Sequence, residues 1–186
     1  SSLLDTSRSM LAEDIKPSRL ERSKLAILDL LESLVGDRIA IVTFAGNSSV
    51  KCTLTQDYAF VRMALADIST ESTSRGGTMI GDAIRKASED VFDGKSRQYK
   101  DIILITDGED HDSFPVQAAE KAAEQGIRII AIGLGNETEG VSAGARELAE
   151  TALSIPMANG VESLNVAVTA SLIAYAGLIS DHHLVR

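Results

Sequence analysis

Short runs of aliphatic and β-branched residues alternate with stretches of helical spacing along most of this 186-residue chain. Strands that alternate with helices are typical of a mostly parallel sheet with helices on both faces. Residues 102–105 are all apolar, as expected for a strand that is buried on both sides. The sequence therefore predicts a doubly wound, Rossmann-like α/β domain. Its predicted strands are residues 3–4, 39–44, 102–106, 127–134 and, weakly, 153–157.

Three helices are predicted between these strands. Ser18 and Glu21 have the spacing of a capping box, and Gly36 is suited to end the helix that begins there. Residues 50–55 alternate between apolar and polar types, which indicates an antiparallel strand at the edge of the sheet. The apolar positions that predict the helices are Leu20, Leu28, Leu31 and Val35, then Ile80, Ile84, Ala87 and Val91, and finally Val116, Ala119 and Ala123 up to Gly126.

The composition argues against several classes of function. A formal charge of −9 and the lack of a basic run disfavour nucleic-acid binding, which depends on neutralising phosphates. The longest weakly polar run, residues 166–179, is shorter than the ~20 residues that span a bilayer. Cys52 is the single cysteine, so the chain can form neither an intramolecular disulfide nor a cysteine-based metal cluster. A cation or a basic partner suits this charge better.

Two of the predicted strands lead directly into an aspartate. Asp5 follows the first strand and precedes two hydroxyl residues, Ser7 and Ser9, whereas Asp107 follows the strand at 102–106. The carboxyl ends of parallel strands meet at one edge of a sheet, where open α/β folds bind their ligands. Carboxylate and hydroxyl oxygens suit a hard cation such as Mg²⁺ or Mn²⁺. The sequence therefore predicts a metal site at this edge, with one coordination position left open.

These residues resemble the von Willebrand factor type A domain, whose metal-ion-dependent adhesion site combines Asp-x-Ser-x-Ser with a distant Thr and a distant Asp. Asp5, Ser7 and Ser9 match the first motif, Thr78 the second and Asp107 the third. The resemblance covers residues 3–140. It is strongest to the bacterial Bat-type aerotolerance proteins in the segments 7–14, 19–22, 36–38 and 106–111.

The resemblance implies a module that binds protein partners. Asp5, Ser7 and Ser9 would hold Mg²⁺ or Mn²⁺ directly, Thr78 directly or through water, and Asp107 through water. An acidic side chain from a partner would fill the open position. Each motif also has a purely structural explanation, because Asp-x-Ser-x-Ser is common in turns, Thr78 can cap a helix, and acidic loops are often simply solvated.

Residues 141–186 differ in composition from the rest of the chain. They carry six charged side chains, which are Arg146, Glu147, Glu150, Glu162, Asp181 and Arg186. The segments 134–140 and 155–168 resemble the last two motifs of SpoU-type, knotted RNA 2′-O-ribose methyltransferases. That resemblance implies an S-adenosylmethionine pocket, with cofactor-binding positions at Gly135, Ile155, Met157 and Leu164. The earlier motif of this family, which carries the catalytic Arg, has no convincing equivalent here.

We interpret the chain as a natural or engineered fusion. A von Willebrand A-like part, residues 1–140, is joined to a methyltransferase-like closing αβα part, residues 141–186, in one α/β domain. Because the half of the methyltransferase that forms the threading loop is missing, we expect an unknotted fold. The Bat-like parent would be membrane-anchored and the methyltransferase-like parent cytoplasmic, so the location stays open, as does the oligomeric state.

Three functions remain open from the sequence. A metal-dependent binding module without catalytic residues is the favoured interpretation. The alternatives are a fragment of an S-adenosylmethionine-dependent RNA methyltransferase and an engineered chimera with no selected function. Phosphoryl transfer is disfavoured, because Ser7 replaces the second aspartate of the Asp-x-Asp motif that haloacid-dehalogenase-like phosphatases use.

Overall fold

The computed structural model describes residues 1–72, 77–92, 99–107, 110 and 112–134. Its sheet has five strands in the order β3-β2-β1-β4-β5. β1 pairs in parallel with β2 and β4, β4 pairs in parallel with β5, and β3 runs antiparallel to β2 at the edge. The predicted doubly wound, mostly parallel sheet is therefore confirmed. The strands are β1 (Ser2–Asp5), β2 (Ile39–Phe44), β3 (Ser48–Thr55), β4 (Lys100–Thr106) and β5 (Ile127–Gly133).

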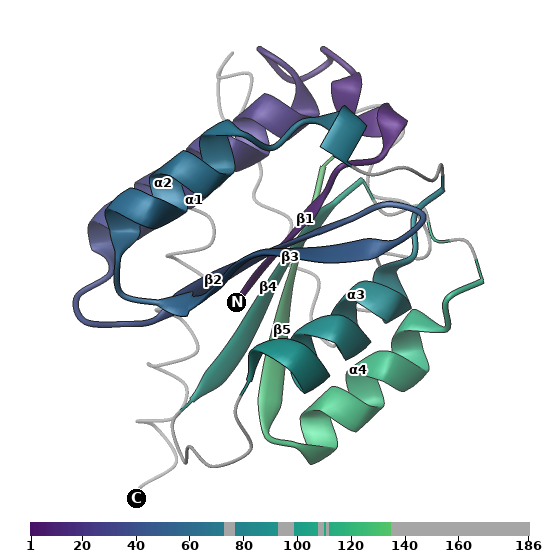
Figure 1. The fold of residues 1–186 in the computed structure, drawn as a ribbon. Helices are drawn as coiled ribbons and strands as arrows, with labels where there is room; N and C mark the ends of the chain where they lie inside the picture. The colour runs from purple at the N-terminus through teal and green to yellow at the C-terminus, as the bar shows by residue number, and fades with distance from the viewer. Residues whose placement is uncertain (73–76, 93–98, 108–109, 111, 135–186) are drawn as a thin grey trace, which may run out of the picture.

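Two pairs of helices cover the two faces of this sheet, with α1 and α2 on one side and α3 and α4 on the other (Figure 1). The helices are α1 (Arg19–Ser33), α2 (Tyr58–Ala66), α3 (Ile80–Lys86) and α4 (Pro115–Glu124), with 3₁₀ turns η1 (Arg8–Leu11) and η2 (Thr70–Ser72) and a π-helical turn η3 (Ala87–Val91). The predicted strand at 153–157 and the closing αβα part at 141–186, which was expected to be unknotted, lie outside the described residues.

The first helix begins where the sequence predicts and ends earlier. The Ser18 hydroxyl accepts a hydrogen bond from the Glu21 amide at 3.2 Å, so the predicted N-cap is confirmed. The chain leaves the helix at Leu34, whose backbone is extended, and Gly36 then adopts a left-handed conformation at φ 82°. Val35 is consequently 92% exposed, so its predicted place in the buried stripe was wrong.

α2 was not predicted from the sequence, the predicted stripe of Ile80, Ile84, Ala87 and Val91 is buried as expected, and α4 buries other residues than predicted. Asp57 caps α2 by accepting a hydrogen bond from the Phe60 amide, and Val61 and Leu65 are buried one turn apart. The helix predicted over residues 80–91 changes to π-helical geometry in η3. On α4 the buried residues are Ala118 and Ala122, whereas the predicted stripe residue Val116 is 44% exposed. Alanines are spread around α4, so the sequence does not mark one buried face. Packing against α3 decides which of these alanines are buried.

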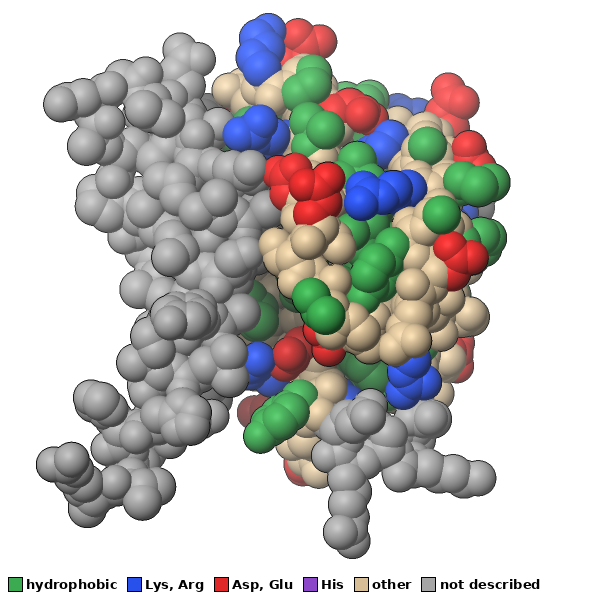
Figure 2. Space-filling model, turned by 90° about the vertical axis from the view of Figure 1, so that its left-hand side faces the viewer, with side chains coloured by type: hydrophobic (Ala, Val, Ile, Leu, Met, Phe, Trp, Pro, Cys, Tyr) green, Lys and Arg blue, Asp and Glu red, His purple; other side chains and the backbone are tan. Residues whose placement is uncertain are grey.

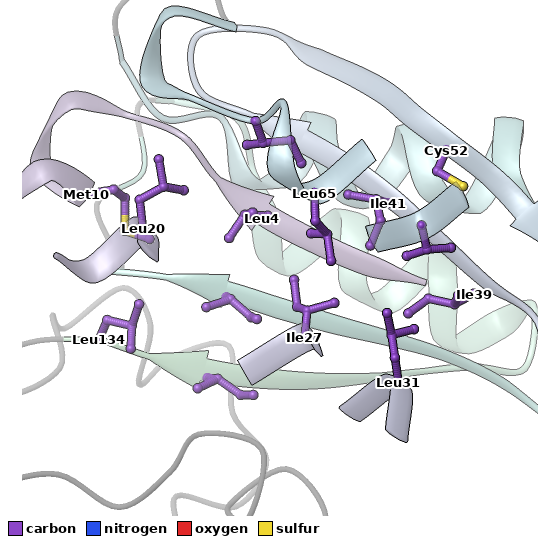
Figure 3. Packing of buried hydrophobic residues seen from close by; sticks show 14 residues of the cluster. Leu4, Met10, Leu20, Ile27, Leu31, Ile39, Ile41, Cys52, Leu65 and Leu134 are labelled. Atoms are coloured by element: carbon purple, nitrogen blue, oxygen red, sulfur yellow. The ribbon is translucent and has the colours of Figure 1, made fainter. Parts of the chain in front are cut away.

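The core consists of one apolar cluster on each face of the sheet, because neighbouring strand residues point to opposite sides. Leu4 belongs to the cluster beneath α1 and α2, and Leu3 to the cluster beneath α3 and α4. Figure 3 shows the first cluster, in which Met10 from η1 joins Leu20 and Ile27 from α1. Every residue of β1 is buried, so the end of this strand meets a water-poor environment.

The end of α1 at Ser33 predicts that truncating Leu31 and truncating Val35 affect stability differently. Leu31→Ala should lower the free energy of unfolding by about 2–5 kcal/mol, because Leu31 is 2% exposed and its loss leaves a cavity. Val35→Ala, the matched aliphatic truncation, should change it by about 0.5 kcal/mol or less. Chemical denaturation of both variants measures the difference, and equal effects would contradict the observed helix end.

Candidate metal site

Two carboxylates meet where the strand order changes direction. The chain passes from β1 to β2 on one side and returns to β4 on the other side of β1, and such switch points form ligand crevices in α/β sheets. Asp5 is the last residue of β1 and is fully buried. Asp107 directly follows β4, which pairs with β1. The structure therefore brings the two predicted aspartates to one edge.

The Asp5 carboxylate is buried with hydrogen bonds to both oxygens, and no cationic side chain among the described residues pairs with it. Its Oδ1 accepts a hydrogen bond from the Ser7 amide at 2.8 Å, and its Oδ2 accepts one from the Thr106 hydroxyl at 2.7 Å. Burial raises the pKa of Asp5 to about 6, the hydrogen bonds from Thr106 and Ser7 oppose this, and the charge of Asp107 adds to it. A divalent cation would supply the missing positive charge.

The hydroxyls of Ser7 and Ser9 lie beside each other in the loop after β1. Their Oγ atoms are 2.9 Å apart, and Arg8 between them is exposed to solvent. The start of this loop is fixed to the sheet, because the Thr6 amide and hydroxyl both donate to the Phe44 carbonyl at 2.8 and 3.1 Å. The two hydroxyls are thus held in place ahead of any ligand.

Thr78 is buried close to the end of β2. The amide of the next residue, Met79, donates to the carbonyl of Ala45, which directly follows β2. α3 begins at Ile80 with Met79 in the capping position, so the alternative that Thr78 caps this helix is not what the structure has. The Ile80 amide instead donates to the Asp110 carboxylate at 2.9 Å.

One carboxylate oxygen of Asp107 has no hydrogen-bond partner among the described residues. Its side chain is 3% exposed, and its Oδ2 accepts a hydrogen bond from Nη1 of Arg19 at 3.2 Å. Its Oδ1 is buried and makes no hydrogen bond. An unsatisfied buried oxygen is unfavourable, and a cation or its bound water would satisfy it. Arg19 lies 88 residues from Asp107 in the chain, and no sequence motif predicted their contact.

The loop that follows Asp107 is fastened to α3 through Ser113. The Ser113 hydroxyl donates to the Asp110 carboxylate and accepts from the Gly81 amide at 2.7 Å, and Arg85 donates to the Ser113 carbonyl at 2.7 Å. A Cβ atom at Gly81 would lie 2.1 Å from the Ser113 carbonyl oxygen, so this close approach requires glycine. The sequence analysis missed this contact as well.

The donor set fits a hard cation. Within the described ranges, no three His, Cys, Asp or Glu side chains gather as a metal cluster, so a site here relies on two carboxylates with hydroxyls. Magnesium and manganese accept such oxygen ligands, and magnesium also keeps bound waters. The positions predicted for S-adenosylmethionine, Gly135, Ile155, Met157 and Leu164, lie outside the described residues.

Two protein families match this chain. Residues 2–109 match the family described as von Willebrand factor type A domain, and residues 79–175 match the SpoU rRNA Methylase family. The matches overlap at residues 79–109, whose described part forms α3, η3 and β4. These findings agree with a chain that combines the two families, and nothing in them supports an engineered origin.

Solved structures of similar proteins share the fold. BatB from Bacteroides thetaiotaomicron is 40% identical with a TM-score of 0.71, over 74% of this chain and 66% of its own. An aerotolerance-related membrane protein from Bacteroides fragilis is 36% identical with a TM-score of 0.69, over 73% and 66%. Proximal thread matrix protein 1 from the mussel byssus is described with a zinc-occupied MIDAS motif, the abbreviation for metal-ion-dependent adhesion site. It is 25% identical with a TM-score of 0.64, over 73% of this chain and 35% of its own. The chain spans 44% or less of the curated relatives it matches.

The burial of Asp5 predicts an unusual pH dependence in buffer without divalent cations. The pKa of Asp5 is about 6 in the folded chain and has a reference value of 3.8, so the folded state binds the proton more tightly. Between these values the free energy of unfolding should therefore fall as pH rises. Asp5→Asn, which carries no charge, should remove this component.

Denaturant titrations of both proteins from about pH 4 to about pH 7.5 measure the effect, because the difference between parent and variant isolates Asp5 from other titrating groups. The variant should gain relative stability as pH rises. Parallel curves would contradict the environment described for Asp5.

Proposed function

The chain belongs to the von Willebrand factor type A domain family over residues 2–109, with residues 79–175 in the SpoU rRNA methylase family, and we propose that it is a metal-ion-dependent module that binds protein partners. The observation that carries the proposal is the pair of buried carboxylates: within the described part of the chain, Asp5 has no cationic partner and Asp107 Oδ1 has no hydrogen bond. The zinc described in the MIDAS motif of the mussel protein supports divalent-metal binding by this family.

In this proposal Asp5, Ser7 and Ser9 hold Mg²⁺ or Mn²⁺ directly. Thr78 binds it directly or through water, and Asp107 through water. When bound, the cation offers an open coordination position to an oxygen ligand. The neighbouring hydrogen bonds from Thr106 and the Ser7 amide keep the Asp5 carboxylate fixed, so little ordering is needed when the cation binds.

An acidic side chain of a protein partner is the ligand that fits this open position, since a carboxylate oxygen binds hard cations well. Nucleic acid fits poorly. Figure 2 shows Lys and Arg side chains scattered among Asp and Glu on the described surface of one face, and the whole chain carries a charge of −9. None of the described helices has the length and apolar character of a membrane-crossing segment.

A second candidate function is methyl transfer, which the SpoU family match favours. It would require S-adenosylmethionine at Gly135, Ile155, Met157 and Leu164, together with a group that activates the ribose hydroxyl. The arginine-bearing motif of that family has no convincing equivalent in the sequence. We therefore propose binding rather than catalysis as the function.

Metal binding predicts a specific stabilisation. Millimolar Mg²⁺ or Mn²⁺ should raise the melting temperature, because a ligand of the folded state stabilises it by mass action. Asp5→Ala should abolish this increment. Glu120→Ala, which removes the same charge from the exposed surface of α4, should retain it.

Thermal melting of the three proteins with and without each cation tests the site. A cation response that Asp5→Ala leaves intact would refute the assignment. Since the ligating carboxylates must be ionised, the increment should also shrink as the pH drops below about 6, the pKa of Asp5 in the folded chain.

A binding function without catalysis predicts that the chain transfers no methyl group to RNA. Incubation with radiolabelled S-adenosylmethionine and bulk transfer or ribosomal RNA should incorporate no label above a heat-denatured control, because methyl transfer needs a positioned catalytic group and the arginine-bearing motif has no convincing equivalent in the sequence. The chain should also fail to retain RNA at physiological salt. Label transferred to RNA would favour the methyltransferase over the binding module.

A further inference from the structure

Arg19 joins two carboxylates, one inside the proposed metal site and one beside it. Its Nε donates to Asp14 Oδ1 at 2.9 Å, its Nη2 donates to Asp14 Oδ2 at 2.7 Å, and its Nη1 donates to Asp107 Oδ2 at 3.2 Å. The fork of the guanidinium thus faces Asp14, and its remaining end faces Asp107. Neither the family matches nor the predicted ligand set assigns a role to this arrangement.

The local structure fixes Arg19 in this place. It is the first residue of α1, where the Ser18 cap sets the start of the helix and the Arg19 amide donates to the Ala12 carbonyl at 3.0 Å. The side chains of Arg19 and Asp14 are 16% and 20% exposed, whereas that of Asp107 is 3% exposed. Solvent therefore screens the Arg19–Asp107 pair much less than a surface ion pair.

The positive charge of Arg19 would repel a divalent cation at this site. A cation that Asp107 held through water would lie near the Arg19 guanidinium, which is hydrogen-bonded to the same carboxylate, and neighbouring like charges repel strongly where water is sparse. Arg19 donates to Asp107 Oδ2, whereas Oδ1 has no hydrogen-bond partner in the part of the chain that the structure describes. The guanidinium and a divalent cation therefore compete for the same carboxylate.

We propose that Arg19 sets the cation affinity of this site by competing with the metal for Asp107, while Asp14 holds the guanidinium and offsets its charge. This inference rests on the proposed metal-dependent function. Asp14 gives Arg19 a second partner, so Arg19 keeps its ion pair when the cation draws the Asp107 carboxylate towards itself. The hydrogen bond to Arg19 correspondingly lowers the pKa of Asp14, which stays ionised as this counter-charge.

The competition predicts effects of opposite sign for the two partners. Arg19→Gln removes the repelling charge and leaves Asp14, so the affinity for Mg²⁺ should increase about tenfold or more, equivalent to about 1.4 kcal/mol. Asp14→Asn leaves the guanidinium with Asp107 as its one carboxylate partner among the described residues, so the affinity should decrease. The double variant should lie between the two. Arg19→Lys keeps the charge and should stay near the parent.

Isothermal titration of the full 186-residue chain and its variants with Mg²⁺ and separately with Mn²⁺ measures these affinities. Lys16→Gln is the matched control, because it removes one positive charge from the same segment at a side chain that is 77% exposed and paired with Glu13. Screening by solvent should limit its effect to about twofold. Circular dichroism checks that each variant is folded.

The outcomes separate this inference from the proposed function. If the parent binds the cations and Arg19→Gln binds them equally or less tightly, Arg19 positions Asp107 and does not compete, and the inference is overturned. Tightening by Arg19→Lys equal to that by Arg19→Gln would also overturn it, because charge would not be the cause. If neither the parent nor Arg19→Gln binds either cation, the proposed metal-dependent function itself is refuted.

Discussion

The burial of a carboxylate at the end of the central strand is the constraint around which this edge of the molecule is arranged. β1 lies between β2 and β4 and is covered by helices on both faces, so Asp5 ends the strand without contact with water. Hydrogen bonds from Thr106 and Ser7 replace part of the lost hydration. These hydrogen bonds offset the loss of hydration only in part, so burial raises the pKa of Asp5 to about 6. A site of this kind favours a bound cation.

The loops around Asp5 are held by the secondary structure that they join. Thr6 donates to the end of β2, the residue after Thr78 donates to Ala45, and Ser113 ties the loop after β4 to α3. Each of these hydrogen bonds fixes a loop that carries a potential ligand oxygen at this edge of the sheet. Preorganised oxygens lose little conformational entropy when they bind a ligand, which is why such sites are built on rigid scaffolds.

The overlap of the two family matches has a structural counterpart. Residues 79–109 include a helix followed by a buried parallel strand, a unit that many α/β folds share. In this chain that strand, β4, pairs with both β1 and β5, ends in Thr106, which donates a hydrogen bond to Asp5, and leads directly into Asp107. The described part of the overlap thus takes the arrangement of the von Willebrand A family. The S-adenosylmethionine positions of the other family lie beyond residue 134.

The sequence alone determined the sheet and the meeting of Asp5 with Asp107, because apolar runs mark buried strands and parallel strands end at one edge. It also marked the start of α1 at Ser18, since capping is a local interaction. Only the tertiary structure decided that Arg19 reaches Asp107 and that Asp110 caps α3. It also selected the alanines of α4 that are buried. These features depend on contacts between distant segments, and local periodicity carries no information about which neighbour a side chain meets.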